Sequence, residues 1–317
     1  MPEIGYWLSS EEHTPLELVR NARAAEEAGF RHAMISDHYH PWVDEQGHSA
    51  FVWGTIGGIA AATERLSLGT GVTCPMIRIH PAVIAQAAAT AGAMMPGRFV
   101  LGLGTGENLN EHILGDRWPS GWERLEMLRE AIEVIRLLWQ GGYQSHRGTH
   151  YRVDEARIYT LPEQLPPIAV AAAKPGAAQL AGENDGLIAV SPDRELVDEF
   201  ESAGGEGKPR HGQLSICWAE SEAEARKTAF RVWPNAGVEG ELSQELPLPR
   251  HFEQATEMVE EEDVAGSMPC GPDPEPVIQS IQEYLDAGFD HVYLHQIGPD
   301  QDGFFEFAKR EILPRFA

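Results

Sequence analysis

The sequence predicts an α/β fold of the (β/α)8 TIM-barrel class, with insertions at the C-terminal face of the barrel. Short apolar segments that suit buried parallel strands alternate along the chain with segments that suit helices. The chain has 317 residues and 42% hydrophobic composition, which suffices for one large core because barrels of this class typically form single domains of about 250 residues. Glycines and polar residues follow several predicted strands, where such barrels carry their active sites.

The first half of the chain contains four predicted strands, each followed by a helix. Apolar residues at helical spacing indicate the first helix, and Gly29 is its predicted C-cap. Pro96 and Gly97 break the alanine-rich third helix before the fourth strand begins. The strands are predicted at 4–7, 33–35, 66–70 and 99–101, and the helices at 15–28, 51–62, 80–95 and 121–140.

The second half continues the alternation after a polar, hairpin-like segment at 141–159. Four further strands are predicted at 167–171, 187–190, 213–218 and 291–294, with helices at 175–181, 276–287 and 304–316. The stretch 233–272 is rich in Pro, Gly and Glu and interrupts this rhythm. We therefore predict a single domain over residues 1–317, in which about 233–272 is an insertion at the mouth of the active site.

The charge balance is strongly acidic, with 24 basic residues, 49 acidic residues and a net charge of −25. This charge disfavours nucleic acid as a partner, and it suits a protein that stays hydrated in concentrated salt. A halophilic source predicts thermal stability that rises between low and molar salt. The N-terminal residues do not read as a signal peptide and no apolar run is long enough to span a membrane, so we expect a cytoplasmic protein.

The stretch RFVLGLGTGENLN at 98–110 is the strongest local indication of a binding site. An apolar strand leads into glycines 102, 104 and 106 and then into an acid and two amides. Glycines at the end of a buried strand let backbone N–H groups approach a bulky or anionic ligand. A tight turn without a ligand is the alternative, and the spacing does not match the dinucleotide-binding fingerprint.

The residues at the predicted strand ends are mostly neutral or aromatic. They include no nucleophile elbow, no HExxH motif and no acids at metal-ligand spacing, and three scattered cysteines do not form a zinc motif. We therefore expect no metal, and a planar cofactor whose own ring carries the chemistry. The predicted mouth residues are Trp7, Asp37, His38, Gly71, Val72, Thr73, residues 104–110, Ala172, Ala173, Lys174, Val190, Ser191, Trp218 and His295.

Three separated motifs, SDHYHPW, GTGVTCPMIRIHPAVIAQAAAT and PGRFVLGLGTGENLNE, resemble those of F420-dependent glucose-6-phosphate dehydrogenases within the luciferase-like barrel superfamily. The likeness runs from the N-terminus to about Trp139, resumes at PPIAVAAAKPGAAQLAGENDG and returns weakly near GPDPEPVIQSIQEYLDAGFDHVYLH. The resemblance implies a luciferase-like TIM barrel, coenzyme F420 as the cofactor, and a homodimer.

The resemblance also implies roles for individual residues. His38 would take the hydroxyl proton of the substrate, Trp42 would line the reacting pocket, and Glu107 would lie near the ring nitrogen that becomes protonated as hydride reaches C5. The alternatives are that His38 is a hydrogen-bonded core histidine and that Glu107 only caps the next helix. Gly71 and Val72 would form a non-prolyl cis peptide behind the ring.

Further residues are assigned by the same resemblance to cofactor or substrate binding. The cofactor-binding set is Asp37, Gly71, Val72, Thr73, Thr105, Gly106, Glu107, Asn110, Ala172, Ala173 and Lys174. The substrate-pocket set is Trp7, Glu11, Val190 and Ser191. Ala173 and Lys174 replace two glycines that contact the cofactor side chain in the family, so that side chain is expected to be held differently, with Lys174 placed to meet its phosphate.

The chain also departs from the family where relatives bind the phosphate of glucose 6-phosphate. Asp193, Ser243 and Ser267 align with three basic residues there, although Arg194 or Arg250 are possible substitutes. We therefore expect an F420-dependent dehydrogenase of an alcohol or sugar other than glucose 6-phosphate. The alternatives are a sugar-phosphate dehydrogenase with a rebuilt phosphate site, an FMN-dependent luciferase-like monooxygenase, and a non-catalytic barrel that only binds the cofactor.

Overall fold

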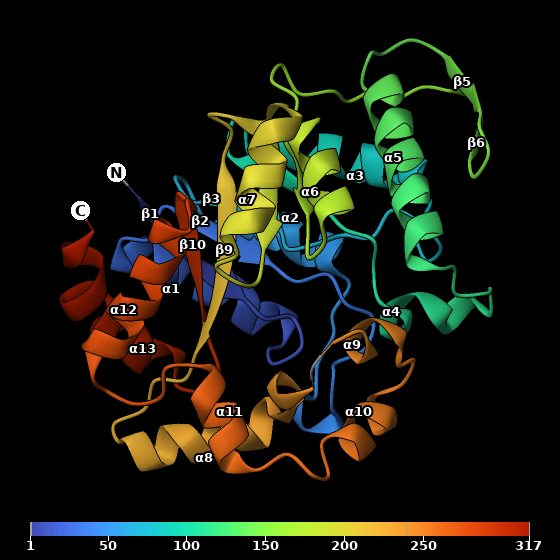
Figure 1. Cartoon of the computed structure of the whole chain (residues 1–317). Helices are drawn as coiled ribbons and strands as arrows, with labels where there is room; N and C mark the ends of the chain where they lie inside the picture. The colour runs from blue at the N-terminus through green and yellow to red at the C-terminus, as the bar shows by residue number, and fades with distance from the viewer. Residues whose placement is uncertain (1, 239, 317) are drawn as a thin grey trace.

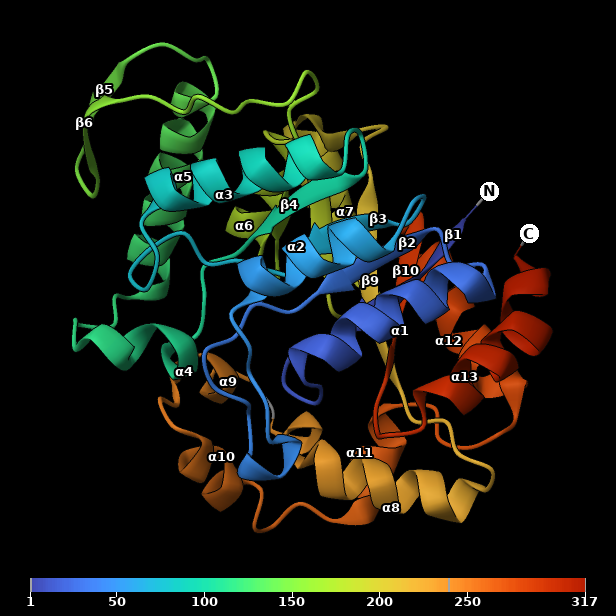
Figure 2. The same cartoon turned by 180° about the vertical axis from the view of Figure 1, so that it is seen from behind.

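The computed structural model describes residues 2–238 and 240–316. Eight parallel strands close into a barrel in the order β1-β10-β9-β8-β7-β4-β3-β2, and helices surround this barrel (Figures 1 and 2). The predicted fold class is therefore confirmed. The predicted domain spans 1–317, of which residues 1, 239 and 317 lie outside the described part of the chain.

All eight predicted barrel strands are present, with ends shifted by one to three residues. The predicted hairpin is also present as the two-stranded antiparallel sheet β5-β6 (Figure 1). The strands are β1 (Glu3–Leu8), β2 (His32–Ile35), β3 (Ser67–Thr70), β4 (Phe99–Leu103), β5 (Gln144–Arg147), β6 (Arg152–Ala156), β7 (Ile168–Ala171), β8 (Gly186–Ala189), β9 (Arg210–Ile216) and β10 (His291–Gln296).

The first helix has the boundaries that the sequence predicts, because capping residues stand at both of its ends. The side chains of Thr14 and Glu17 cap its N-terminus reciprocally, and Gly29 ends it with a φ of 111°, which favours glycine. The helices outside the 233–272 segment are α1 (Pro15–Ala28), α2 (Val52–Ala62), α3 (Pro81–Met94), α4 (Asn108–Glu111), α5 (Gly121–Leu138), α6 (Pro175–Gly182), α7 (Arg194–Phe200), α8 (Glu222–Val232), α12 (Pro274–Asp286) and α13 (Gln301–Phe307).

Two barrel helices, α7 and α8, were not predicted from the sequence. In α8 the buried face consists of Ala225, Ala229 and Val232, which are small residues between charged ones. Helix α13 begins three residues before the predicted start at 304, because the side chain of Asp300 accepts a hydrogen bond from the backbone N–H of Gly303.

The segment 233–272 forms several short helices at the end of the barrel where α4 and α8 lie (Figure 1). Its helix α11 packs on α8 through Val264 and Met268. The helices in this segment are α9 (Leu242–Glu245), α10 (Pro249–Ala255) and α11 (Glu261–Ser267). Within 2–238 and 240–316, no helix has the length and apolar character needed to cross a membrane.

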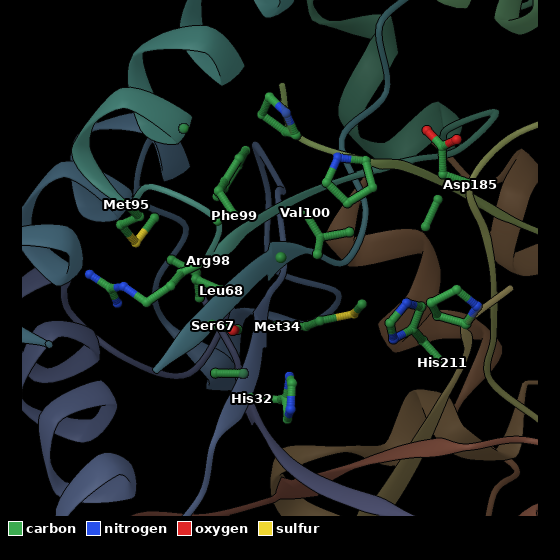
Figure 3. Close-up of a pocket in the computed structure, with 18 of the residues that line it drawn as sticks. His32, Met34, Ser67, Leu68, Met95, Arg98, Phe99, Val100, Asp185 and His211 are labelled. Carbon is green, nitrogen blue, oxygen red and sulfur yellow. The ribbon is translucent and has the colours of Figure 1, made fainter. Parts of the chain in front are cut away.

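A cavity of about 220 Å³ lies at the N-terminal ends of the strands, away from this segment (Figure 3). Three histidines, His32, His211 and His291, meet there, and the ring centroids of His211 and His291 are 4.7 Å apart. Among the described residues no His, Cys, Asp and Glu side chains are arranged to hold a metal ion. Burial, together with the neighbouring His291, lowers the pKa of His211 to about 3.

This buried histidine predicts a loss of stability in acid. In the unfolded chain His211 takes up a proton near its ordinary pKa of about 6.5, whereas in the folded protein it does so only at about 3. The free energy of unfolding therefore has its full value above pH ~6.5. Below that pH it falls by up to about 1.4 kcal/mol per pH unit, because the unfolded chain binds one more proton at this histidine than the folded protein does. We expect His211→Gln to reduce this slope in urea denaturation between pH 6 and 4.5.

His150→Gln is the matched control, because His150 lies on the β5-β6 hairpin and does not line this cavity. The control should keep the slope of the original protein. Equal slopes for all three proteins would show that His211 does not control the acid sensitivity.

Candidate active site

A larger cavity, of about 1120 Å³, opens at the C-terminal ends of the barrel strands. Its wall combines residues that follow the strands with residues of the 233–272 segment, among them Trp233, Ser243 and Phe252. The predicted site residues on this wall are Trp7, Glu11, Asp37, His38, Trp42, Gly71, Val72, Thr105, Gly106, Glu107, Asn110, Ala172, Ala173, Lys174, Val190 and Ser191.

Three residues predicted at the mouth lie elsewhere. Thr73 is fully buried behind the wall, where its hydroxyl donates to Asp37 Oδ2 at 2.7 Å. His295 is also fully buried and pairs with Glu12, and Trp218 packs against Phe307. The placement of these three residues on the cavity wall was therefore wrong, because polar partners and packing inside the barrel draw their side chains away from it.

The floor of the cavity depends on close approach between Gly71 and Trp7. A Cβ atom on Gly71 would lie 2.3 Å from the Trp7 ring, so any larger residue would displace that ring. The peptide bond between Gly71 and Val72 is cis, as the resemblance implied. Gly106, with a φ of 70°, turns the chain where a Cβ would lie 2.5 Å from Cys74 Sγ.

His38 lies between two carboxylates on the cavity wall. Its Nε2 atom is 3.4 Å from Glu11 Oε1 and 3.4 Å from Glu107 Oε2. Its Nδ1 atom is 3.2 Å from the carbonyl oxygen of His40, and because a carbonyl only accepts, this contact places a proton on Nδ1. In the neutral ring Nε2 then keeps its lone pair, which suits a proton acceptor.

Two serine hydroxyl groups hold the Glu11 carboxylate through the oxygen that does not face His38. Its Oε2 atom accepts hydrogen bonds from Ser36 Oγ at 2.6 Å and from Ser9 Oγ at 3.0 Å. The other carboxylate oxygen, Oε1, is the one that faces His38. Glu11 was predicted as a substrate-pocket residue, and the structure places it against the imidazole as well as on the cavity wall.

The pKa values of His38 and Glu107 are both shifted in this cluster. Burial alone lowers the pKa of His38, but the negative charges of Glu11 and Glu107 outweigh burial and raise it above 6.5. Burial raises the pKa of Glu107, and the neighbouring imidazole offsets only part of this rise. The cluster therefore favours holding a proton that is shared between His38 and Glu107.

Glu107 occupies the position before α4, yet its side chain does not cap that helix. Instead its Oε2 atom accepts a hydrogen bond from Asn110 Nδ2 at 3.0 Å. The Oδ1 atom of Asn110 accepts in turn from the backbone N–H groups of Tyr39 and His40. Asn110 thus ties the loop that carries Glu107 to the loop that carries His38.

A buried ion pair that the sequence reasoning missed fixes these loops further. Arg78 donates to Asp37 Oδ1 at 2.9 Å, and its Nε atom lies 3.4 Å from Glu111 Oε1. The side chains of both carboxylates are completely buried, and that of Arg78 is 6% exposed. Arg78 and Glu111 stand inside the two longer motifs, but 33 residues separate them, so no local spacing signals the pair.

The aromatic wall of the cavity joins the barrel to the 233–272 segment. The Trp42 ring lies 5.1 Å from that of His38, and Phe252 of α10 packs edge-on against Trp42 at 5.1 Å between centroids. Trp42 is therefore held beside the imidazole by a residue far away in the sequence.

The positions aligned with a sugar-phosphate site carry no basic side chain. Ser243 and Ser267 line the cavity, whereas the carboxylate of Asp193 caps α7. Arg194 pairs with Asp198 and, like Arg250, does not line the cavity. Among the described residues of the wall, only Arg124 and Lys174 carry a permanent positive charge.

The barrel fold agrees with comparisons to known proteins. Residues 1–291 match the family model described as luciferase-like monooxygenase, so the chain belongs to the luciferase-like family. Within that family it groups with F420-dependent dehydrogenases. It is 37% identical to F420-dependent glucose-6-phosphate dehydrogenases of Nocardia farcinica and Microbacterium testaceum, over 99% and 98% of this chain and 97% and 96% of theirs.

Solved structures support the same placement. An F420-dependent secondary alcohol dehydrogenase in complex with an F420-acetone adduct superposes with a TM-score of 0.91 and 28% identity, over 98% of each chain. The coenzyme F420 dependent tetrahydromethanopterin reductase of Methanopyrus kandleri shares the fold, with a TM-score of 0.79 and 22% identity over 100% of this chain and 99% of that chain.

The buried ion pair yields a prediction about stability. Arg78→Leu leaves the carboxylates of Asp37 and Glu111 buried without a cation, and breaking a buried pair in this way typically costs about 3–5 kcal/mol. We expect the free energy of unfolding, measured by urea denaturation at neutral pH, to fall by that amount. Arg194→Leu is the control, because its pair with Asp198 is exposed and such pairs contribute at most ~0.5 kcal/mol. Equal losses in the two variants would contradict the assigned role of Arg78.

Proposed function

We propose that the chain is an F420-dependent dehydrogenase that transfers a hydride between the deazaflavin C5 and the carbinol carbon of an alcohol or sugar. The observation that carries this proposal is His38, held between Glu11 and Glu107 on the wall of a cavity of about 1120 Å³. The three F420-dependent dehydrogenases named above support the same cofactor and the same class of reaction.

The cavity wall suits this cofactor. Coenzyme F420, when bound, supplies hydride chemistry at its ring. Trp7, Val72 and Ile188 provide apolar surface for a planar ring, and Gly71 and Gly106 keep the backbone free of side chains beside it. The amide of Asn110 and the hydroxyl of Thr105 add polar groups to this wall. Such a mixture of apolar surface and few polar groups is typical of cofactor sites.

His38 is the proposed base for the substrate hydroxyl. With its Nδ1 proton donated to the His40 carbonyl, the neutral ring accepts a proton at Nε2. Glu11, together with Glu107 once it has given up its own proton, then stabilises the imidazolium that forms, because both side chains lie 3.4 Å from that atom.

Glu107 is the proposed proton carrier on the cofactor side. Its raised pKa, which results chiefly from burial, favours a protonated carboxyl closer to neutral pH than in an exposed glutamate. Asn110 fixes its Oε2 atom through a hydrogen bond, so the other oxygen is available for a proton that the cavity's ligand accepts or returns.

The substrate class is an unphosphorylated alcohol or sugar in this proposal. Asp193, Ser243 and Ser267 offer no positive charge to a phosphate dianion, although the relatives named for glucose 6-phosphate make a phosphorylated sugar the alternative. The homodimer is predicted from the resemblance, the salt-dependent stability from the net charge of −25, and the cytoplasmic location from the N-terminal residues and the lack of a long apolar run in the sequence. All three remain predictions.

Cofactor choice is the first test. We expect coenzyme F420 to bind with a dissociation constant in the low micromolar range or below, and FMN at least about tenfold more weakly, a difference of ~1.4 kcal/mol. Fluorescence quenching of the protein's tryptophans in side-by-side titrations measures both. Tighter binding of FMN would favour the luciferase-like monooxygenase instead.

Substitutions at the proton-transfer groups test the mechanism. His38→Ala and Glu107→Gln should each lower turnover at saturating cofactor and alcohol by about 10²- to 10⁴-fold, as expected for loss of a general acid or base. Their affinity for F420 should stay within about tenfold. Because the pKa of His38 is raised and the base form is neutral, alcohol oxidation should increase with pH through an apparent pKa above 6.5.

Tyr39→Phe is the matched control, since Tyr39 adjoins His38 in the chain but is exposed and does not line the cavity. Its turnover should equal that of the original protein. Unchanged turnover in either active-site variant would remove that residue from its assigned role.

A further inference from the structure

Two polar side chains of β9, Gln213 and Ser215, line the large cavity. They stand two residues apart on one strand, so their side chains point to the same face of the sheet. Both residues are partly exposed, and neither takes part in the proton transfer proposed above. They therefore form a polar strip of the wall whose function is open.

A buried histidine lies behind this strip. His295 of β10 is the register partner of Ser215 in the parallel pair β9-β10. Its Nδ1 atom lies 3.4 Å from Gln213 Nε2 and 3.5 Å from Ser215 Oγ. Trp233, which also lines the cavity, packs edge-on against the imidazole at 4.7 Å between ring centroids. Because the His295 side chain is fully buried, it acts on the cavity only through these neighbours.

Glu12 fixes the proton of this histidine. Its Oε1 atom lies 2.9 Å from His295 Nε2, and its Oε2 atom accepts from the backbone N–H of Gly298 at 2.9 Å. Burial by itself raises the pKa of Glu12, but the hydrogen bonds from His295 and Gly298 outweigh burial and lower it below the ordinary value. An ionised carboxylate only accepts, so Nε2 carries a proton. The amide nitrogen of Gln213 only donates, so Nδ1, which it faces, carries none.

The direction of these hydrogen bonds decides what the strip offers to a ligand. The Gln213 amide and the Ser215 hydroxyl both donate to Nδ1 and share its one lone pair, which agrees with the two long distances. Gln213 Oε1 and the lone pairs of Ser215 Oγ remain, and no N–H or O–H group of the described residues donates to them. The strip therefore offers hydrogen-bond acceptors. Hydroxyl groups satisfy such acceptors, whereas a phosphate dianion has no donor.

The rest of the wall is polar and offers little free positive charge. Glutamates of the 233–272 segment pair with both permanent cations of the wall, Arg124 and Lys174. A phosphate on the substrate would gain a cation there only by displacing a carboxylate. Further hydroxyl and amide groups that line the cavity are Ser191, Asn235, Ser243 and Ser267.

We propose that Gln213 and Ser215 bind hydroxyl groups of an uncharged sugar or polyol, and that Glu12 and His295 are positioning residues that make this strip an acceptor. The inference rests on the proposed function, since it takes the ligand to be the alcohol that is oxidised, and it narrows that alcohol to a polyhydroxylated one. A site built to hydrogen-bond a hydroxyl group discriminates against a substrate without it, because the polar groups of the site are then left unpaired.

The test compares three substrates with the F420-saturated protein. These are glucose, glucose 6-phosphate and 2-butanol, which all carry a carbinol group and differ in charge and in further hydroxyl groups. Steady-state rates of cofactor reduction give KM and kcat for each. We expect the original protein to have a KM for glucose at least about tenfold below its KM for either other substrate.

Substitution of the acceptors should affect mainly the sugar. Gln213→Leu should raise the KM for glucose at least about tenfold, or ~1.4 kcal/mol, and Ser215→Ala about threefold or more. The KM for 2-butanol and all kcat values should change less than about threefold. Gln282→Leu is the matched control, because Gln282 is an exposed glutamine of α12 that does not line the cavity. This control should keep every constant of the original protein.

Glu12→Gln tests the positioning role. An amide at this position can donate to His295 Nε2, so Nδ1 takes the ring proton, and Gln213 and Ser215 turn their own donors toward the cavity. We expect the KM for glucose to rise and that for glucose 6-phosphate to fall, each by about threefold or more, with 2-butanol unaffected. A merely structural role of Glu12 would raise all three KM values together. If urea denaturation shows that this variant does not fold, Gln213→Leu and Ser215→Ala still decide.

The outcomes separate this inference from the proposed function. An unchanged KM for glucose in Gln213→Leu, or cofactor reduction by 2-butanol alone, would overturn the inference and leave the proposed function standing. If no substrate reduced the cofactor, the proposed function would be wrong. Saturation-transfer NMR of glucose with the cofactor-free protein would then test the strip directly. We expect a glucose signal that Gln213→Leu abolishes, and no signal with the original protein would overturn the inference.

Discussion

The active-site geometry depends on the buried contacts of Arg78 with Asp37 and Glu111. Asp37 follows β2, Arg78 follows β3 and Glu111 ends α4 after β4, so one guanidinium ties together three consecutive loops. His38 adjoins Asp37 in the chain, and Glu107 lies one turn before Glu111. The ion pair thus holds the loops on which His38 and Glu107 lie 3.4 Å apart, although it touches neither residue. A fixed guanidinium suits this task because its donors have a rigid, planar arrangement.

The barrel could be predicted from the sequence because its strands are short apolar runs. Most of its helices also begin and end at residues that are typical of helix ends, such as Pro15 and Gly29 around α1. Helix α8, whose buried face is alanine and valine, was not predicted. The three predicted mouth residues that lie elsewhere show that the sequence does not predict the orientation of a side chain. A position at a strand end does not reveal which way a side chain points, and buried partners decided this for Thr73 and His295. Arg78 and Arg124 bind groups distant in sequence, which no spacing encodes.

The charges are distributed unevenly between the surface and the cavity. The chain carries 25 more acidic than basic residues, which repels an anionic ligand at long range. An anion therefore needs local positive potential, and within the described wall Arg124 and Lys174 supply its only permanent cations. The glutamates around α9 neutralise both cations, so the 233–272 segment contributes carboxylates there as well as the aromatic contact of Phe252 with Trp42.

In the proposed mechanism, one distribution of protons over His38 and Glu107 prepares both residues for proton transfer. If His38 were neutral and both Glu11 and Glu107 were ionised, two negative charges would lie within 3.4 Å of one imidazole nitrogen in a largely buried site, which is unfavourable. The cluster therefore retains a proton. The pKa values of His38 and Glu107 are both raised because either residue can hold this one proton. In the proposed mechanism, His38 is neutral when this proton resides on Glu107, and His38 can then accept the substrate proton. The same state leaves Glu107 protonated, so base and acid are prepared together.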